Sequence, residues 1–198
     1  MISHADNFYN ALHDALTPRS GFGVEAYEKM VGELVALRER NGRLFCLGLG
    51  GGAANAAHAV NDFRKLCDIE AYAPTDGVAE LTARANDEGW RTIFSGWLEV
   101  SRLSSNDAVM VFSVGGGTPG VSSCIYDAID LATRRGATIL GVVGKSEGIT
   151  AQNGDAVVVV GATGLLGPML TPVTEAAQVA VLHALVSDPR LQSRATKW

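Results

Sequence analysis

The sequence is short of the residues that mark several protein classes. Its 198 residues include only three cysteines, which are too few and too scattered for a disulfide framework or a zinc ribbon. No apolar run approaches the roughly 18 continuous residues of a membrane span. The N-terminus lacks the basic start and apolar core of a signal peptide. We therefore expect a protein of the reducing cytoplasm that has no membrane partner.

Positive charge is also scarce. Sixteen Lys and Arg residues against 21 Asp and Glu residues give a net charge of −5, which argues against a nucleic-acid partner. Charged residues make up 19% of the chain and hydrophobic residues 47%, a balance typical of an α/β protein with a buried sheet. An anion-binding site in such a chain has to rely on backbone N–H groups and on a local positive electrostatic field.

Apolar segments alternate with helical patterns along the chain. Strands are expected at 43–48, 69–73, 109–114, 138–143 and 156–160. Helices are expected at 5–16, 24–41, 53–66, 76–85, 90–103, 119–135 and 172–186. Strands separated by helices predict right-handed crossovers and a mainly parallel sheet between two helical layers. The fold class is therefore α/β, a three-layer sandwich with helices on both faces.

The length favours one domain over residues 1–198. The N-terminal helices, at about 5–41, are expected to pack on that domain or on a neighbouring subunit. The tail at 188–198 is expected to be loosely held, as chain ends often are.

Glycine, in contrast, is plentiful, and it gathers where two predicted strands end. The first strand is followed by Gly50, Gly51 and Gly52, and the other by the segment 113–118, with Gly115, Gly116 and Gly117 between Ser113 and Thr118. Glycines let the backbone turn sharply and let bare N–H groups approach an anion at a helix start. Ligands of open α/β sheets bind at this end of the strands. The two turns predict a phosphate site; the alternative is that the glycines only allow tight packing.

Two pairs of ionisable residues form a second candidate site. His58 and Asp62 are four residues apart on one predicted helix, and Glu175 and His183 are eight apart on the last. Each pair is expected to share a helix face. If the two helices pack together, the four groups can converge on a divalent cation or act as a general acid and base. The alternative is a pair of satisfied core histidines with ordinary surface carboxylates.

Three further polar residues remain, and the first two are ambiguous. Asp87 either contacts a sugar hydroxyl or caps the helix that follows it. Asn55 is open to the same two interpretations, with capping or turn formation favoured. Lys145 is expected in a surface loop.

At these residues the sequence resembles the sugar isomerase (SIS) family, and within it the phosphoheptose isomerases. The resemblance covers about residues 20–187. It is carried by the segments Gly48–His58 with Asp62, Asn86-Asp87 with Ile93–Ser95, Ser113–Val121, Gly144-Lys145, and the last helix through His183. It implies a flavodoxin-like SIS fold and an aldose–ketose isomerase that converts sedoheptulose 7-phosphate to a mannoheptose 7-phosphate. It also implies a homo-oligomer, typically a tetramer.

The resemblance implies roles for individual residues. Asp62 and His183 take the positions of the acid–base pair. The positions that hold Zn²⁺ in some members correspond to His58, Asp62, Glu175 and His183. Contacts with the phosphosugar are implied for Gly51, Gly52, Asn55, Asp87, Ser113, Gly115, Gly116, Gly117, Thr118 and Glu175.

The sequence also departs from the family pattern. Several hydroxyls usual in both glycine turns are missing, and each lost neutral hydrogen bond costs roughly 0.5–1.5 kcal/mol of phosphate affinity. The usual Glu is Asp62, and the usual Gln is Glu175, whose charge repels a phosphosugar but attracts a cation. These departures keep a second hypothesis open, a non-catalytic SIS protein with a phosphosugar-binding, regulatory or assembly role.

Overall fold

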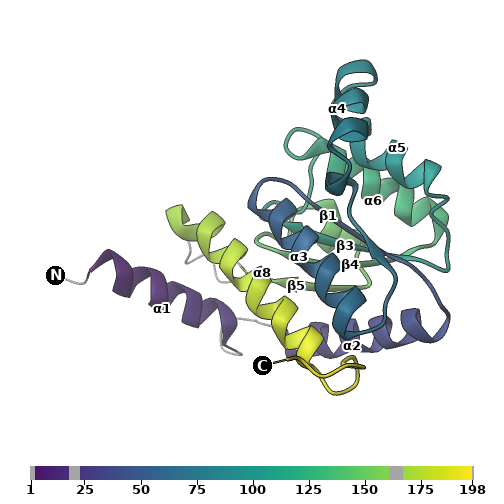
Figure 1. Cartoon of the computed structure of the whole chain (residues 1–198). Coiled ribbons are helices and arrows are strands. Elements are labelled where there is room, and N and C mark those ends of the chain that lie inside the picture. Colours follow the sequence, from purple (N-terminus) through teal and green to yellow (C-terminus); the bar gives the residue numbers. More distant parts are fainter. Residues whose placement is uncertain (1–2, 18–22, 161–166, 198) are drawn as a thin grey trace.

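A computed structural model describes residues 3–17, 23–160 and 167–197 of the chain. Its centre is a five-stranded, all-parallel sheet with the order β2-β1-β3-β4-β5 (Figure 1). The strands are β1 (Leu44–Gly48), β2 (Ala71–Tyr72), β3 (Ala108–Ser113), β4 (Thr138–Val143) and β5 (Ala156–Val159). The three inner strands are almost wholly buried, as expected for a parallel sheet covered on both faces.

Helices cover both faces of this sheet, which confirms the predicted fold class. One face packs against α2 (Val24–Glu39), α3 (Gly51–Leu66) and α8 (Leu170–Ser187). The other packs against α5 (Thr92–Val100) and α6 (Ser123–Arg135). Alternate residues of each strand point to opposite faces. Cys46 therefore belongs to the first core and Phe45 to the second.

The remaining helices lie around this sandwich. Among the N-terminal elements, α2 contacts β5, whereas α1 (His4–Leu16) lies along α8 and extends away from the sheet (Figure 1). The helix α4 (Val78–Asp87) projects at the other end of the molecule. A short helix, α7 (Ile149–Asn153), follows β4, and 3-10 turns form at η2 (Pro74–Asp76) and η3 (Gly167–Met169).

Three details of the chain differ from the sequence expectations. The helix α6 begins at Ser123 rather than near Pro119, because the N–H of Thr118 donates to the carbonyl of Val121 and closes a turn first. The helix α4 continues through Asp87, where an interruption was expected. The helix α7 was not expected at all, since its five residues are too few to show a periodic pattern.

The C-terminal tail is held more firmly than the sequence suggests. Leu191 is completely buried, and its carbonyl accepts a hydrogen bond from Arg38 at 2.7 Å. The backbone N–H and the hydroxyl of Ser193 both donate to the carbonyl of Leu66 at the end of α3. The expectation of a loosely held tail was therefore wrong for the described residues up to this point.

The segment Gly167–Ser187, which includes α8, is long and apolar enough to cross a membrane by length and composition alone. In the fold, however, α8 is a core helix. Val173, Ala177, Val181 and Leu185 are buried in the same core as α2 and α3. This packing explains the apolar composition.

Candidate functional site

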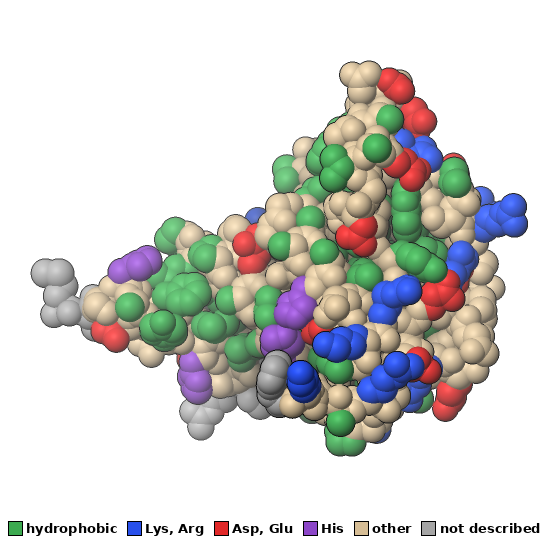
Figure 2. All heavy atoms as spheres, viewed as in Figure 1, with side chains coloured by type: hydrophobic (Ala, Val, Ile, Leu, Met, Phe, Trp, Pro, Cys, Tyr) green, Lys and Arg blue, Asp and Glu red, His purple; other side chains and the backbone are tan. Residues whose placement is uncertain are grey.

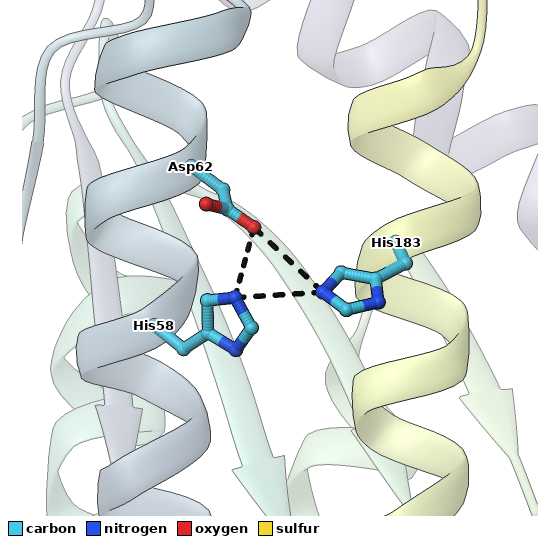
Figure 3. Close-up of side chains that lie close together, drawn as sticks. All are labelled: His58, Asp62 and His183. Atoms are coloured by element: carbon cyan, nitrogen blue, oxygen red, sulfur yellow. Dashed lines mark hydrogen bonds and ion pairs between the residues drawn. The ribbon is translucent and has the colours of Figure 1, made fainter. Parts of the chain in front are cut away.

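The helices α3 and α8 pack side by side, which the sequence could not show. Their contact brings together His58 and Asp62 of α3 and His183 of α8 (Figure 3). The Nε2 of His58 lies 3.1 Å from Oδ2 of Asp62, and the Nε2 of His183 lies 4.0 Å from the same oxygen. The two Nε2 atoms are 3.4 Å apart. Three of the four predicted ligands therefore meet.

The carboxylate of this cluster is held in place while the imidazoles face solvent. The side chain of Asp62 is 12% exposed, against 40% for His58 and 57% for His183. The second carboxylate oxygen of Asp62 accepts a hydrogen bond of 2.8 Å from the Asn61 side chain. Oδ1 of Asp62 is thus held by Asn61, and Oδ2 points towards the rings of His58 and His183.

The spacing of these atoms fits a small divalent cation. Around tetrahedral zinc, with ligand distances near 2.0–2.2 Å, neighbouring ligand atoms lie about 3.3 Å apart. The distances of 3.1, 3.4 and 4.0 Å between the Asp62 and histidine atoms surround that value. His58, Asp62 and His183 can therefore hold a metal ion as three protein ligands, with a further position for water or substrate.

Glu175, the fourth predicted ligand, is not part of this cluster. Its carboxyl group lies against Gly51 in the first turn of α3, where an added Cβ would overlap it. The reason is geometric. Eight residues advance about 12 Å along a helix and turn about 80° beyond two full turns, so Glu175 and His183 share a face only loosely. The described side chains therefore bring three of the four residues together, and Glu175 as a metal ligand stays a prediction.

The two glycine turns meet at the carboxyl edge of the sheet, around a cavity of about 350 Å³. The predicted residues Gly52, Ser113, Gly115 and Glu175 line it. Gly52 also serves tight packing, since an added Cβ there would meet the Phe112 carbonyl. Gly52 thus packs against the sheet and also faces the cavity, and the phosphate site at the first turn stays a prediction.

Glycine conformations build the second turn. Gly116 and Gly117 have φ values of +69° and +81°, which other residues adopt with strain. The N–H of Gly116 donates to the Ser113 hydroxyl at 3.1 Å. The hydroxyl of Thr118 is bonded to the backbone of Val121 as both donor and acceptor. The Thr118 hydroxyl therefore uses its hydrogen within the turn, whereas the Ser113 hydroxyl only accepts there.

Two other predicted residues have structural partners. The side chain of Asn55 donates to the Glu175 carbonyl at 3.1 Å and to Gln178 at 2.8 Å, which ties α3 to α8. Asp87 is exposed at the end of α4 and accepts a bond from Asn86. It is not among the described residues that line this cavity or the pocket at the histidines.

Lys145, Ser122 and Gln178 were not proposed as site residues, yet they line the cavity. Lys145 is in an exposed loop, as expected, directly after β4. Its position after a parallel strand was the signal that could have placed it beside the glycine turns. Gln178 is fully buried and donates to the Val142 carbonyl, so its contribution is to hold α8 on the sheet.

A search with models of known families finds no match. Individual proteins do match. The chain is 33% identical over 143 residues to a phosphoheptose isomerase of Geobacter metallireducens, covering 70% of this chain and 69% of the relative. It is 31% identical over 159 residues to one of Geotalea daltonii, covering 77% of each. The structure of phosphoheptose isomerase from Neisseria gonorrhoeae superposes with a TM-score of 0.76 at 21% identity, covering 92% of this chain and 94% of that one.

Proposed function

Since the chain belongs to the SIS-domain phosphosugar isomerase family, we propose that it is an aldose–ketose isomerase acting on a phosphorylated sugar. The substrate proposed is sedoheptulose 7-phosphate, which would be converted to a mannoheptose 7-phosphate. The observation that carries the proposal is the convergence of Asp62 and His183 from two helices at one opening. A carboxylate and an imidazole are the groups that proton transfer between adjacent sugar carbons needs.

The phosphate is proposed to bind in the cavity at the glycine turns. Lys145 supplies the positive charge there, and Ser122 lies at the start of α6, where helix N–H groups favour an anion. About 12 Å of helix separate Glu175, at this cavity, from His183. A phosphosugar in an extended form is long enough to bring its far end towards the histidines.

The reaction moves two protons. Asp62 would remove a proton from C1 of the ketose and return it to C2. His183 would give a proton to the carbonyl oxygen at C2 and take one from the hydroxyl at C1, so that an aldehyde forms at C1 and a hydroxyl at C2. The hydrogen bond from Asn61 fixes Oδ1 of Asp62. The other oxygen, Oδ2, is left for this proton transfer.

In a metal-assisted alternative, we propose that His58, Asp62 and His183 bind Zn²⁺, and the atoms that ligate the ion then do not transfer protons. When bound, such an ion would polarise the substrate carbonyl. Glu175 would join this set only if its side chain turned away from Gly51. Elemental analysis of protein purified without chelator should give stoichiometric zinc, and His183→Ala should lose it. Zinc retained in that variant would place the metal elsewhere.

We propose a homo-oligomer, most simply a tetramer, in the cytoplasm. Tyr9 on α1 is 67% exposed, and Figure 2 shows hydrophobic side chains gathered on this helix, which extends from the body. An apolar surface of this kind supports contact with a second copy. A monomer mass in gel filtration would contradict the proposal.

The activity is tested by incubating purified, zinc-supplied protein with sedoheptulose 7-phosphate and following the products by NMR. We expect a new aldose phosphate, and its loss in Asp62→Asn. No conversion of this substrate or of other ketose and aldose phosphates would reject the isomerase.

One observation favours the second candidate, a non-catalytic SIS protein. The Thr118 hydroxyl donates to the Val121 carbonyl within its own turn, and Glu175 brings a negative charge to the cavity. Both features weaken phosphosugar binding. A stable protein partner in a pull-down, together with absent turnover, would support this candidate.

A further inference from the structure

Two residues of opposite charge line the cavity at the glycine turns, which has a volume of about 350 Å³. Glu175 reaches it from α8, and Lys145 reaches it from the loop after β4. Among the described residues, the two side chains do not pair with each other, and neither has another hydrogen-bond or ion-pair partner. The carboxylate and the ammonium group are therefore both available to a ligand.

The charge of Glu175 is only partly offset by its surroundings. Its carboxyl group lies against Gly51, in the first turn of α3. The partial positive charge at the start of a helix is about half an elementary charge, which is too small to cancel a carboxylate. Glu175 is also half-buried, so water screens its charge less than at an open surface. A negative field from Glu175 therefore extends into the cavity.

A bound phosphate makes the cavity more negative still. A phosphate monoester carries about −1.5 to −2 charges at neutral pH. Lys145 balances one of these charges, and Glu175 adds one negative charge of its own. With one phosphate bound, the cavity therefore has an excess of roughly two negative charges. A second anionic group on the ligand would be repelled, whereas hydroxyl groups would not be and an ammonium group would be attracted.

We propose that Glu175 determines the charge specificity of this cavity. Beside the phosphate, it admits the neutral hydroxyls or an ammonium group of a sugar, and it excludes a second anionic group. The substrate class is sugar monophosphates that lack a carboxylate or a second phosphate, and sedoheptulose 7-phosphate belongs to it. The inference rests on the proposed function for the position of the phosphate, and it deepens that function by naming which sugar phosphates enter.

Three ligands with a six-carbon chain and a phosphate at C6 test the proposal. Glucosamine 6-phosphate carries an amine, glucose 6-phosphate carries only hydroxyls, and 6-phosphogluconate carries a carboxylate. Isothermal titration of the full-length protein is done at about pH 7, where an amine of this kind is largely protonated. The dissociation constants should rise in the order given, each step by about two- to fivefold, as for a partly exposed pair of charges. Equal constants for the three ligands would overturn the proposal.

The variant Glu175→Gln keeps the shape of the side chain and removes its charge. The dissociation constant of 6-phosphogluconate should fall and that of glucosamine 6-phosphate should rise, so that their ratio shrinks by about fivefold or more. Glu147→Gln is the matched control, because Glu147 is an exposed carboxylate in the loop of Lys145 and is not among the described residues that line the cavity. It should leave the ratio unaltered. Thermal unfolding checks that both variants are folded.

A third variant and a turnover assay separate this proposal from the isomerase. Lys145→Gln should weaken the binding of all three ligands, because it acts on the phosphate that they share. Turnover of sedoheptulose 7-phosphate is measured on the wild type. Ligand ratios that depend on Glu175, without turnover, would support the charge specificity and reject the isomerase alone. Turnover with ratios that Glu175→Gln leaves unaltered would reject the charge specificity alone.

Discussion

The carboxyl group of Glu175 lies against Gly51 in the first turn of α3, where a side chain at residue 51 would overlap it. The start of a helix carries unpaired N–H groups and a partial positive charge that favour an anion. The chain thus places its own carboxylate at the first glycine turn. Under the proposed function, a substrate phosphate would therefore bind at the second turn and Lys145.

Glu175→Gln should therefore strengthen phosphosugar binding. The change keeps the shape of the side chain and removes a like charge from the cavity. We expect the KM or the dissociation constant to fall about three- to tenfold, the effect of roughly 1 kcal/mol between partly solvated charges. Isothermal titration or steady-state kinetics measures it, with Glu39→Gln at the exposed end of α2 as the control. An unaltered or higher constant would show that Glu175 does not repel the ligand.

Gly52→Ala should destabilise the protein by about 2 kcal/mol, because the new Cβ would overlap the Phe112 carbonyl of β3 and push α3 from the sheet. Gly32→Ala on α2 is the matched control. Nothing lies within 4 Å of its added Cβ, so the better helix former should stabilise by about 0.5–1 kcal/mol. Urea unfolding compares the two, and equal effects would contradict the packing role of Gly52.

Asp107→Asn should destabilise the fold by about 3 kcal/mol at neutral pH, the cost of breaking a buried ion pair. Asp107 is 1% exposed and accepts bonds from the Arg43 guanidinium at 2.8 and 3.0 Å and from Ser104. Burial alone would raise the pKa of Asp107, but these bonds outweigh burial and lower it.

The pH dependence of this effect follows from the lowered pKa. A carboxyl group whose pKa is lower in the folded state stabilises fully above its unfolded pKa, near 3.9. That contribution disappears as the pH falls through the folded pKa. Unfolding at several pH values should show a constant difference between wild type and Asp107→Asn above about pH 5, narrowing below about pH 4. A difference independent of pH down to 2 would contradict the ion pair.

Thr174→Val should stabilise the protein by up to about 1 kcal/mol, because its hydroxyl is buried without a hydrogen-bond partner among the described residues. Thr150→Val provides the contrast. Its hydroxyl is equally buried but donates to the Gly116 carbonyl at 2.8 Å, so its loss should cost about 1 kcal/mol. Thermal unfolding separates the two, and a loss of stability in Thr174→Val would indicate a partner for that hydroxyl.

The sequence predicted the strands and the main helices well, because local patterns decide them. The strand at 138–143 lies where it was expected, and the helix expected at 53–66 forms as Gly51–Leu66. The turn between Thr118 and Val121, which delays α6, has no signature in hydrophobic periodicity. Helix boundaries next to glycine turns were therefore the least predictable part of the fold.

The sequence by itself determined which chemical groups this protein carries, and the spacing of His58 and Asp62 on one helix followed from helical geometry alone. Only the tertiary structure decided that His183, more than a hundred residues away, joins them, because that depends on how α3 and α8 pack. The same packing places the carboxyl group of Glu175 against Gly51 and the C-terminal tail beside the histidine pocket. Periodicity fixes the face of one helix, whereas contacts between distant segments depend on how the whole core is filled.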